Sequence, residues 1–198
     1  MLGKTHRLVI LDARKMSFFI TGLPRSRTAW LANFLTYDGV LCGHELMFGM
    51  TTATFVDELK HWSGSAETLL LARWREIDDQ LKDAPIIIIR RAPKDVMASL
   101  RQLKLPIADL GIALTWMQSL LEDFAAQHPN ALNFSFSELN NNSTLQMIWQ
   151  YVSGKEPQPE RRVKMLQAMN VQITADRWME FFYRPQPTQN THQLPVVS

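Results

Sequence analysis

Four consecutive isoleucines, Ile86–Ile89, constrain the fold of this chain more than any other segment. Pro85 precedes the run and two arginines follow it, so the run has the length of a strand. A strand that is apolar at every position is typical of a parallel sheet covered by helices on both faces. The run therefore predicts an α/β protein.

Segments of strand and helix character alternate along the rest of the sequence. Strands are expected at 17–21, 40–42, 86–89 and 131–136, and helices at 27–36, 54–62, 67–81, 93–103, 109–127, 143–152 and 160–169. Parallel strands separated by helices place the helices on the two faces of one sheet. We therefore expect a P-loop-like three-layer sandwich with a central parallel sheet flanked by helices.

Length and composition limit the alternatives. A chain of 198 residues fits one domain, here 16–184, with an N-terminal extension at 1–15 and a flexible, proline-containing tail at 185–198. The net charge of +2 favours neither nucleic acid nor a membrane surface, and no apolar run approaches the length of a membrane span. The single cysteine suits a reducing compartment, so a cytoplasmic location is expected.

Two arginines and two hydroxyl side chains crowd the turn after the first expected strand. Residues 22–30 read Gly-Leu-Pro-Arg-Ser-Arg-Thr-Ala-Trp and lead into a helix, whose first N–H groups and dipole attract anions. Arg25 and Arg27 can form charge-assisted hydrogen bonds with anionic oxygens, and Ser26 and Thr28 add short donors. The segment predicts a phosphate-binding loop; the alternative is an ordinary loop with solvated arginines.

This loop differs from the ATP-binding pattern G-x-x-x-x-G-K-[ST]. The second glycine and the lysine are missing, and Arg27 and Thr28 stand at their positions. The Ile86–Ile89 strand also ends in Arg90 and Arg91, not in the carboxylate that helps to hold Mg²⁺ in many nucleotide hydrolases. Both departures disfavour a metal-dependent kinase. The five histidines have no metal-ligand spacing, so no metal site is expected.

Residues 23–31, Leu-Pro-Arg-Ser-Arg-Thr-Ala-Trp-Leu, resemble the 5′-phosphosulfate loop of sulfotransferases that use 3′-phosphoadenosine-5′-phosphosulfate (PAPS). Residues 91–99, Arg-Ala-Pro-Lys-Asp-Val-Met-Ala-Ser, resemble the 3′-phosphate motif of the same family. A weaker resemblance lies at 133–139, where a strand ends in an acidic residue and leucine. The resemblance spans about 17–154 and implies a sulfotransferase-like domain at 16–184.

The resemblance also implies roles for individual residues. Arg25 would balance charge on the leaving phosphate, and Trp30 would stack on the adenine. Arg91 and Ser99 would bind the 3′-phosphate. The 5′-phosphate would be bound by the loop, and the nucleotide-binding residues are thus Pro24, Arg25, Ser26, Arg27, Thr28, Ala29, Trp30, Arg91 and Ser99.

Two features depart from the family pattern. Arg27 replaces a glycine, so the loop cannot rely on the positive φ that glycine adopts easily. Arg27 either adds a phosphate contact or alters how the loop wraps its ligand. The Gly/Lys-rich segment that closes over the nucleotide in cytosolic sulfotransferases has no clear counterpart, and Gly154-Lys155 and Arg161-Arg162 are the candidates to replace it.

A general base is expected just after the second strand, where His44 and Glu45 are adjacent. A carboxylate after a Cys-Gly pair resembles the base region of tyrosylprotein sulfotransferases. Because side chains alternate in direction along a strand, only one of the two should face the ligand, and Glu45 is favoured over His44. A helix cap or a solvated turn residue is the alternative reading of this pair.

These observations predict a PAPS-dependent sulfotransferase that transfers a sulfuryl group to a hydroxyl or amine of a small-molecule or biopolymer acceptor. The alternatives are a P-loop kinase that uses ATP, and a non-catalytic nucleotide-binding protein on the same scaffold. Acceptor contacts are expected from 48–81 and 178–184. An apolar cluster near Trp178 would form an acceptor wall or the contact of a homo-oligomer.

Apolar residues at helical spacing within 109–127 are interpreted as core and not as ligand contacts. They are Trp116, Met117, Leu120, Leu121 and Phe124. His61 and Trp62 are interpreted as a packed helix end.

Overall fold

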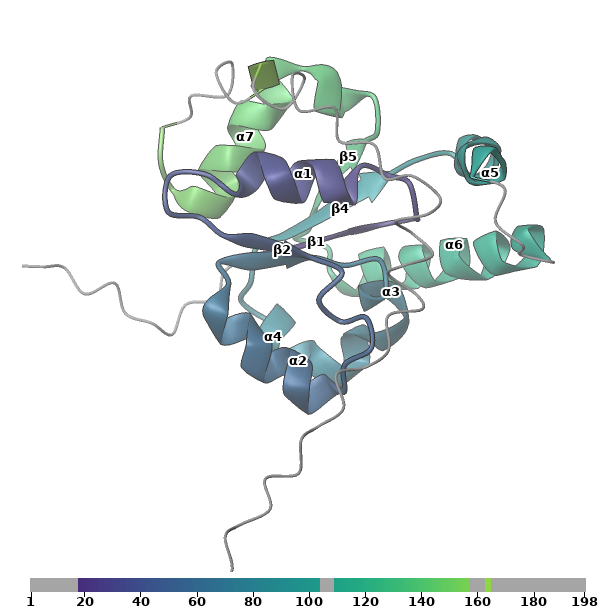
Figure 1. Cartoon of the computed structure of the whole chain (residues 1–198), viewed down its shortest axis with the longest axis horizontal. Coiled ribbons are helices and arrows are strands. Elements are labelled where there is room, and N and C mark those ends of the chain that lie inside the picture. The colour runs from purple at the N-terminus through teal and green to yellow at the C-terminus, as the bar shows by residue number, and fades with distance from the viewer. Residues whose placement is uncertain (1–17, 104–108, 157–162, 165–198) are drawn as a thin grey trace, which may run out of the picture.

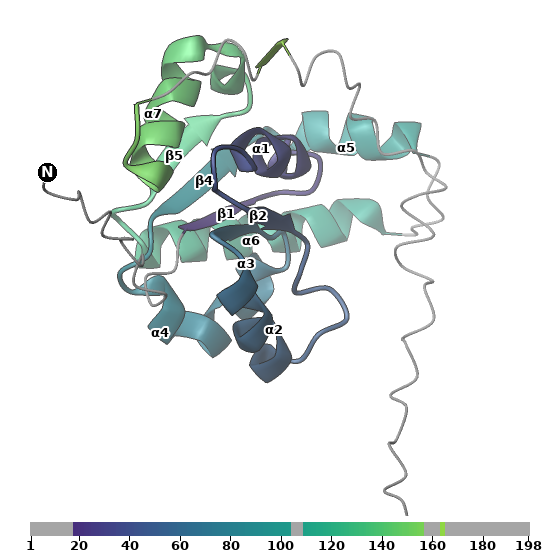
Figure 2. The same cartoon turned by 60° about the vertical axis from the view of Figure 1, so that its left-hand side comes forward.

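Five parallel strands form the middle layer of the molecule (Figures 1 and 2). The computed structural model describes residues 18–103, 109–156 and 163–164. The strands are β1 (Phe18–Gly22), β2 (Cys42–His44), β3 (Gly64–Ala66), β4 (Ile86–Arg90) and β5 (Leu132–Ser135). Their order in the sheet is β2-β3-β1-β4-β5, and every pairing is parallel. The expected extension at 1–15, the tail at 185–198 and most of the helix at 160–169 lie outside the described residues.

Helices form the two outer layers. One face carries α1 (Thr28–Leu35) and α7 (Asn142–Ser153), and the opposite face carries α2 (Thr52–Glu58), α3 (Leu70–Arg73), α4 (Asp78–Leu81) and α6 (Leu110–Gln127) (Figures 1 and 2). Helix α5 (Pro93–Gln102) lies beside the sheet and packs against α6. Short 3₁₀ turns occupy Leu59–His61, Trp74–Ile77 and Glu138–Asn140. The predicted P-loop-like α/β sandwich is confirmed.

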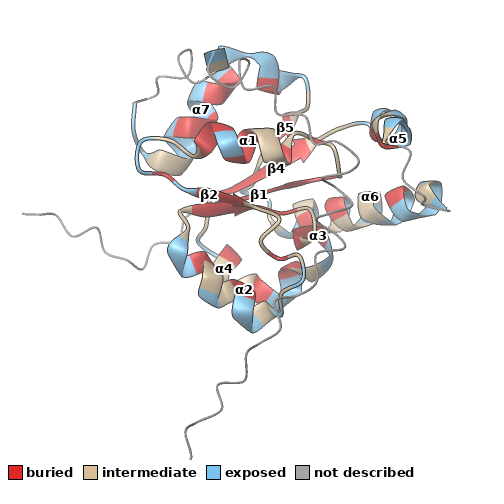
Figure 3. Ribbon diagram, viewed as in Figure 1, coloured by how far each residue is buried: buried red, intermediate tan, exposed pale blue. Residues whose placement is uncertain are grey.

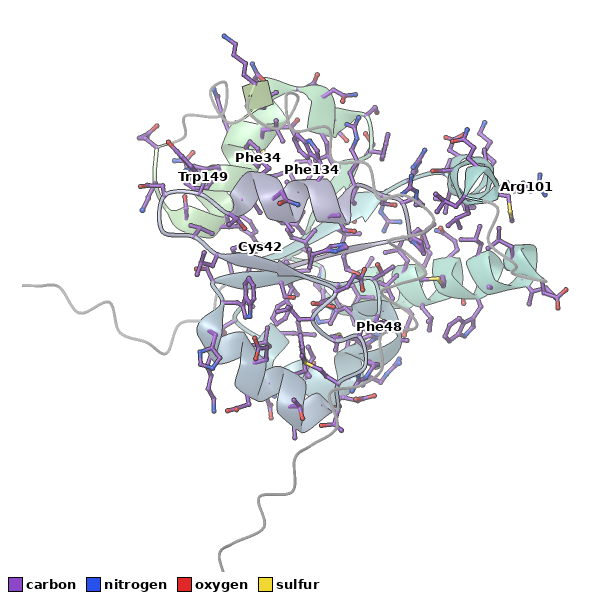
Figure 4. All side chains as sticks on the ribbon, in the orientation of Figure 1. Phe34, Cys42, Phe48, Arg101, Phe134 and Trp149 are labelled. Atoms are coloured by element: carbon purple, nitrogen blue, oxygen red, sulfur yellow. The ribbon has the colours of Figure 1, made fainter. Side chains whose placement is uncertain are left out.

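The four isoleucines divide between the two faces of the sheet. Ile87 and Ile89 pack with Phe18 and Ile20 under α1 and α7, whereas Ile86 and Ile88 pack toward α6. All four are buried, as Figure 3 shows for the central strands. Three aromatic side chains that Figure 4 labels help to fill the face under α1, namely Phe34, Phe134 and Trp149. The side chains of a strand point alternately to the two faces of the sheet, and helices cover both faces here. Every position of the run is therefore apolar.

Strand β3 was not predicted. The sequence predicts one long helix at 67–81 and no strand at Gly64; both predictions are wrong. Residues 64–66 form a strand between β1 and β2, and 70–81 form two short α-helices separated by a 3₁₀ turn. The strand consists of Gly, Ser and Ala, which carry no strand signal. Gly64 is small because the ring of Phe18 packs over it: a Cβ there would lie 2.6 Å from three ring atoms.

Other predictions differ in detail. The second strand begins at Cys42 and not at Val40, and the helix expected at 54–62 runs from Thr52 to Glu58 before a 3₁₀ turn. Within α6, Leu121 and Phe124 are buried as expected, but Trp116 is 56% exposed. The prediction that Trp116 is core is wrong because this half of α6 extends beyond the sheet (Figure 1).

Cys42 opens the edge strand β2, and its thiol is buried in the cluster under α1. Burial, with a smaller contribution from the nearby Glu67 carboxyl, raises the pKa of this thiol well above its ordinary value. Among the described residues, no helix has both the length and the apolar character that crossing a membrane requires.

Candidate functional site

The carboxyl ends of the five strands meet at one edge of the sheet, and the segments that follow them carry the chemically reactive side chains. In parallel α/β sheets this edge is where ligands bind. The residues that follow the strands are the 23–27 loop after β1, Glu45 after β2, Glu67 after β3, Arg91 after β4 and Phe136 after β5.

The loop between β1 and α1 has an unusual backbone. Arg25 and Arg27 both have a φ of 65°, in the left-handed region, and the N–H of Ser26 donates to the carbonyl of Leu23 at 3.2 Å. Arg27 is the N-cap of α1, and its carbonyl accepts the hydrogen bond from Leu31 at 2.9 Å. The expectation that the loop cannot use a positive φ at this position is therefore wrong: arginine adopts the conformation that glycine favours. Such a conformation costs about 1–3 kcal/mol and accumulates at functional sites.

Gly22 fixes the close approach of this loop to the neighbouring strand. A Cβ at Gly22 would lie 2.5 Å from the carbonyl oxygen of Ile89. A glycine is therefore required where β1 passes into the loop.

Ser26 carries a buried hydroxyl donor in this loop. Its side chain is fully buried, and its Oγ makes no hydrogen bond among the described residues. A buried polar group that lacks a partner costs about 1–3 kcal/mol, so such groups mark sites where a ligand or water completes the bonding. The other hydroxyl of the loop, Thr28 Oγ1, lies 3.4 Å from His44 Nε2.

The fold brings together Arg25, Arg91 and Ser99. The Nε of Arg25 donates to Ser99 Oγ at 3.1 Å, and Nη1 of Arg91 donates to the backbone carbonyl of Arg25. The Nε of Arg91 is buried and has no partner among the described residues. The three residues expected to bind phosphate from two separate motifs thus lie in one hydrogen-bonded group.

A third arginine belongs to the same region. Arg27 Nη1 donates to Asn140 Oδ1 at 2.6 Å, and its guanidinium lies 4.5 Å from the centre of the Phe136 ring. The guanidinium of Arg91 lies 4.2 Å from the centre of the same ring. Phe136 and Asn140 were not predicted as site residues, because only the pairing of β4 with β5 places them beside the loop.

The charges of these three arginines are not neutralised within the described part of the chain. None of Arg25, Arg27 and Arg91 forms a salt bridge there, whereas the adjacent Arg90 pairs with Glu122 at 2.8 Å. Partial burial lowers the pKa of Arg91, and the charges of Arg25 and Arg27 lower it further, against the opposing effect of Asp95. The edge is therefore a concentration of positive charge suited to an anion.

His44 and Glu45 lie side by side at the end of β2. His44 Nε2 is 3.8 Å from Glu45 Oε1, and Glu45 also accepts hydrogen bonds from the backbone and the hydroxyl of Thr68. His44 contacts the loop at Thr28, whereas Glu45 contacts Thr68 and His44. Glu45 has a φ of 54°, so the strand alternation ends before it. That only one of the two faces the ligand, and that this one is Glu45, stays a prediction.

Burial changes the protonation of both side chains. It lowers the pKa of His44 to about 4, so the imidazole is neutral near pH 7. It raises the pKa of Glu45, although the two hydrogen bonds from Thr68 oppose the shift. A carboxylate with a raised pKa is a stronger base once ionised.

Glu67 is a further buried carboxyl that the sequence analysis missed. It accepts hydrogen bonds from the N–H groups of Leu46 at 2.7 Å and Met47 at 3.1 Å, and from the hydroxyl of Ser65. Burial, and then the charge of Glu45, raise its pKa to about 8. Glu67 thus holds the turn that carries Glu45. The only sequence signal was a lone acidic residue in a stretch, 62–72, that carries no other charge.

The remaining predicted nucleotide contacts are placed at the start of α1. Trp30 stacks on Phe34, with ring centres 5.5 Å apart and planes 8° apart, and is partly buried against the core. One face of its ring is therefore occupied by Phe34. Pro24 and Ala29 are half-buried in the loop and in the first turn of α1. Among the described residues, no three His, Cys, Asp or Glu side chains form a group that could hold a metal ion.

Comparisons with known proteins find similarity to solved structures but not to described families. No protein-family model matches the sequence, and no curated protein matches it. The crystal structure of shikimate kinase from Bacteroides thetaiotaomicron resembles this chain with a TM-score of 0.42 and 15% sequence identity. The similarity covers 78% of this chain and 97% of that one.

Proposed function

We propose that this chain is a sulfotransferase that moves a sulfuryl group from PAPS to a hydroxyl or amine of an acceptor. The observation that carries the proposal is the group of Arg25, Arg27 and Arg91, which lack carboxylate partners among the described residues and lie at the same sheet edge as Glu45. A donor with separate phosphates needs several cations, and a sulfuryl acceptor needs a base. Both the cations and the base lie at this edge of the sheet.

The side chains at the edge fit such a donor. The unpartnered Ser26 hydroxyl and the first N–H groups of α1 would bind the 5′-phosphate, with Thr28 as a further donor. Arg25 would stabilise the charge that develops on the leaving phosphate. Arg91 and Ser99 would bind the 3′-phosphate, for which the buried, unpartnered Nε of Arg91 provides a donor.

Glu45 is the proposed general base. The acceptor oxygen or nitrogen forms a bond to sulfur as the bond from sulfur to the phosphate oxygen breaks, and the acceptor proton passes to Glu45. The products are the sulfated acceptor and adenosine 3′,5′-bisphosphate. His44 is the weaker candidate because burial keeps its pKa near 4 and its ring lies between Thr28 and Glu45. In this proposal the neutral imidazole orients the Glu45 carboxylate.

Calorimetric binding of adenosine 3′,5′-bisphosphate tests the donor site. Wild-type protein should bind it, and Arg91→Ala should weaken binding by about tenfold or more, as expected for loss of a charge-assisted hydrogen bond. Arg90→Ala is the matched control, since it removes the same charge one residue away from a side chain that pairs with Glu122. No binding by the wild type, or equal effects of the two variants, would refute the assignment.

Transfer from labelled PAPS across a panel of hydroxyl and amine acceptors tests the reaction itself. Glu45→Gln should retain bisphosphate binding and lose about 10²-fold or more of the transfer rate, the range expected for removal of a general base. If no acceptor is sulfated while the bisphosphate still binds, the chain is a non-catalytic nucleotide-binding protein.

A kinase that transfers phosphate from ATP is the second candidate, because a parallel sheet with a loop between the first strand and the first helix is also the arrangement of P-loop phosphotransferases. The two proposals differ in the nucleotide bound. A larger increase in melting temperature with ATP–Mg²⁺ than with the bisphosphate would favour the kinase. The reverse order would favour the sulfotransferase.

A further inference from the structure

The Phe136 ring links two arginines that are far apart in the sequence. Arg27 lies 4.5 Å and Arg91 lies 4.2 Å from the ring centre, distances typical of cation–π contacts. Phe136 itself is fixed by a hydrogen bond from its N–H to the carbonyl of Arg90 at 2.8 Å. The ring therefore holds two positive charges near each other at the end of β5.

This arrangement directs Arg27 away from the loop that carries it. Its Nη1 is held by Asn140, which lies in the 3₁₀ turn after β5, so the guanidinium reaches toward the β5 side of the site. Asn140 occupies one of the five N–H donors of the guanidinium. Arg27 thus shares the location of Arg91, which the proposed function assigns to the second phosphate.

A bound anion would relieve two unfavourable features of the region around the Phe136 ring. Burial, and then the charges of Arg25 and Arg27, lower the pKa of Arg91, and Arg91 Nε is buried without a partner among the described residues. A phosphoryl group carries two negative charges and several acceptor oxygens, so it can neutralise both guanidiniums and accept from the buried Nε.

We propose that Arg27 is a specificity-determining residue that acts with Arg91 over the Phe136 ring and selects nucleotides carrying a second phosphate apart from the 5′-phosphate. This inference rests on the proposed function, which supplies the nucleotide, and it adds a role for the arginine found where the family pattern has glycine. Arg91 also donates to the Arg25 carbonyl, so the second subsite is bonded to the loop that binds the first phosphate.

The test is the preference for adenosine 3′,5′-bisphosphate over adenosine 5′-monophosphate, measured by calorimetry on the full chain. Wild type should prefer the bisphosphate. Arg27→Ala should reduce that preference by about tenfold, while affinity for the monophosphate changes by less than about threefold. Arg27→Gly should give the same loss, and it keeps the left-handed backbone that alanine strains.

Two further variants distinguish an effect on the subsite for the second phosphate from a general effect on the loop. Phe136→Leu keeps both guanidiniums and an apolar side chain but removes the ring face, so it should also reduce the preference. Arg90→Ala should leave it unchanged. An unchanged preference in both Arg27 variants, or an equal loss for both nucleotides, would overturn the inference. If wild type binds neither nucleotide, the proposed function fails first, and the two failures are thereby distinguished.

Discussion

At the scale of single residues, the site is built from strained backbone. Arg25, Arg27 and Glu45 are three of the four non-glycine residues with positive φ in the described chain, and the fourth, Asp38, lies in a turn outside the site. Proteins tolerate the free-energy cost of such conformations where the surrounding structure fixes them and the resulting geometry serves ligand binding. The strain at Arg27 and Glu45 thus agrees with the roles proposed for both side chains.

The strain at residue 27 can be measured by comparing two variants. Arg27→Gly and Arg27→Ala both lose the contacts to Asn140 and Phe136, but only glycine adopts a φ of 65° without a steric penalty. Arg27→Gly should therefore be more stable than Arg27→Ala by about 1 kcal/mol in urea unfolding. Equal stabilities, or a more stable alanine variant, would contradict a left-handed residue 27.

The Glu67 carboxyl should make stability depend on pH. Its pKa rises from 4.5 in the unfolded chain to about 8 in the folded one, so the folded state binds the proton more tightly. The contribution of Glu67 to stability is complete below about pH 4.5 and is lost as the pH rises through about 8. Urea unfolding of wild type and Glu67→Gln at about pH 5 and pH 8 measures this. Between these two pH values the free energy of unfolding of the wild type should fall by roughly a few kcal/mol relative to that of Glu67→Gln. The same difference between the two proteins at both pH values would contradict the raised pKa.

At the scale of elements, the sequence predicted those with strong local signals. The Ile86–Ile89 run predicted β4, and the apolar pattern at 143–152 predicted α7, which ends at Gly154 with a φ of 66°. Strand β3 was not predicted because its small residues carry no local strand signal. Gly64 is small because the ring of Phe18 packs over it, a tertiary contact that a local sequence pattern does not reveal. The long helix expected at 67–81 begins only at Leu70, because Glu67 is hydrogen-bonded to the turn after β2, and a 3₁₀ turn interrupts it at Trp74–Ile77.

Two glycine substitutions test these assignments. Gly64→Ala should destabilise the protein by about 1–3 kcal/mol, because its Cβ would overlap the Phe18 ring in the core. Gly111→Ala is the control: the nearest atom would be 3.9 Å from its Cβ, in helix α6, where alanine should stabilise by up to about 1 kcal/mol. A tolerated Gly64→Ala in thermal unfolding would contradict the position of β3.

At the scale of the whole molecule, parallel topology assembles the site. The two motifs at 22–30 and 91–99 could be identified from the sequence because each is contiguous and chemically distinctive. Their meeting with Phe136 and Asn140 could not be predicted, because it depends on which strands are neighbours. The hydrogen bonds from Glu67 to the turn after β2 depend on the strand order in the same way. The pairing of His44 with Glu45 was missed because it depends on a single backbone angle.

The distribution of charge over the molecule predicts how salt affects binding. The net charge is only +2, so attraction of an anion comes from the local group of three arginines and not from the chain as a whole. Bisphosphate affinity should therefore fall severalfold between about 0.05 and 0.5 M NaCl, because the Debye screening length shortens to a few ångströms. Calorimetry at several salt concentrations should show a shallower dependence for Arg91→Ala. A parallel dependence in wild type and variant would contradict a local origin.

The buried thiol of Cys42 provides a chemical reporter of motion at this edge of the sheet. Because it is the chain's single cysteine, is enclosed beneath α1 and has a raised pKa, an alkylating reagent reacts with it only when β2 separates from its covering helix. The rate of alkylation therefore measures local opening of the strand that carries His44, without any introduced label. A ligand that fastens His44 and Glu45 to the loop would slow that chemistry, so occupancy of the site becomes readable as protection of one sulfur atom.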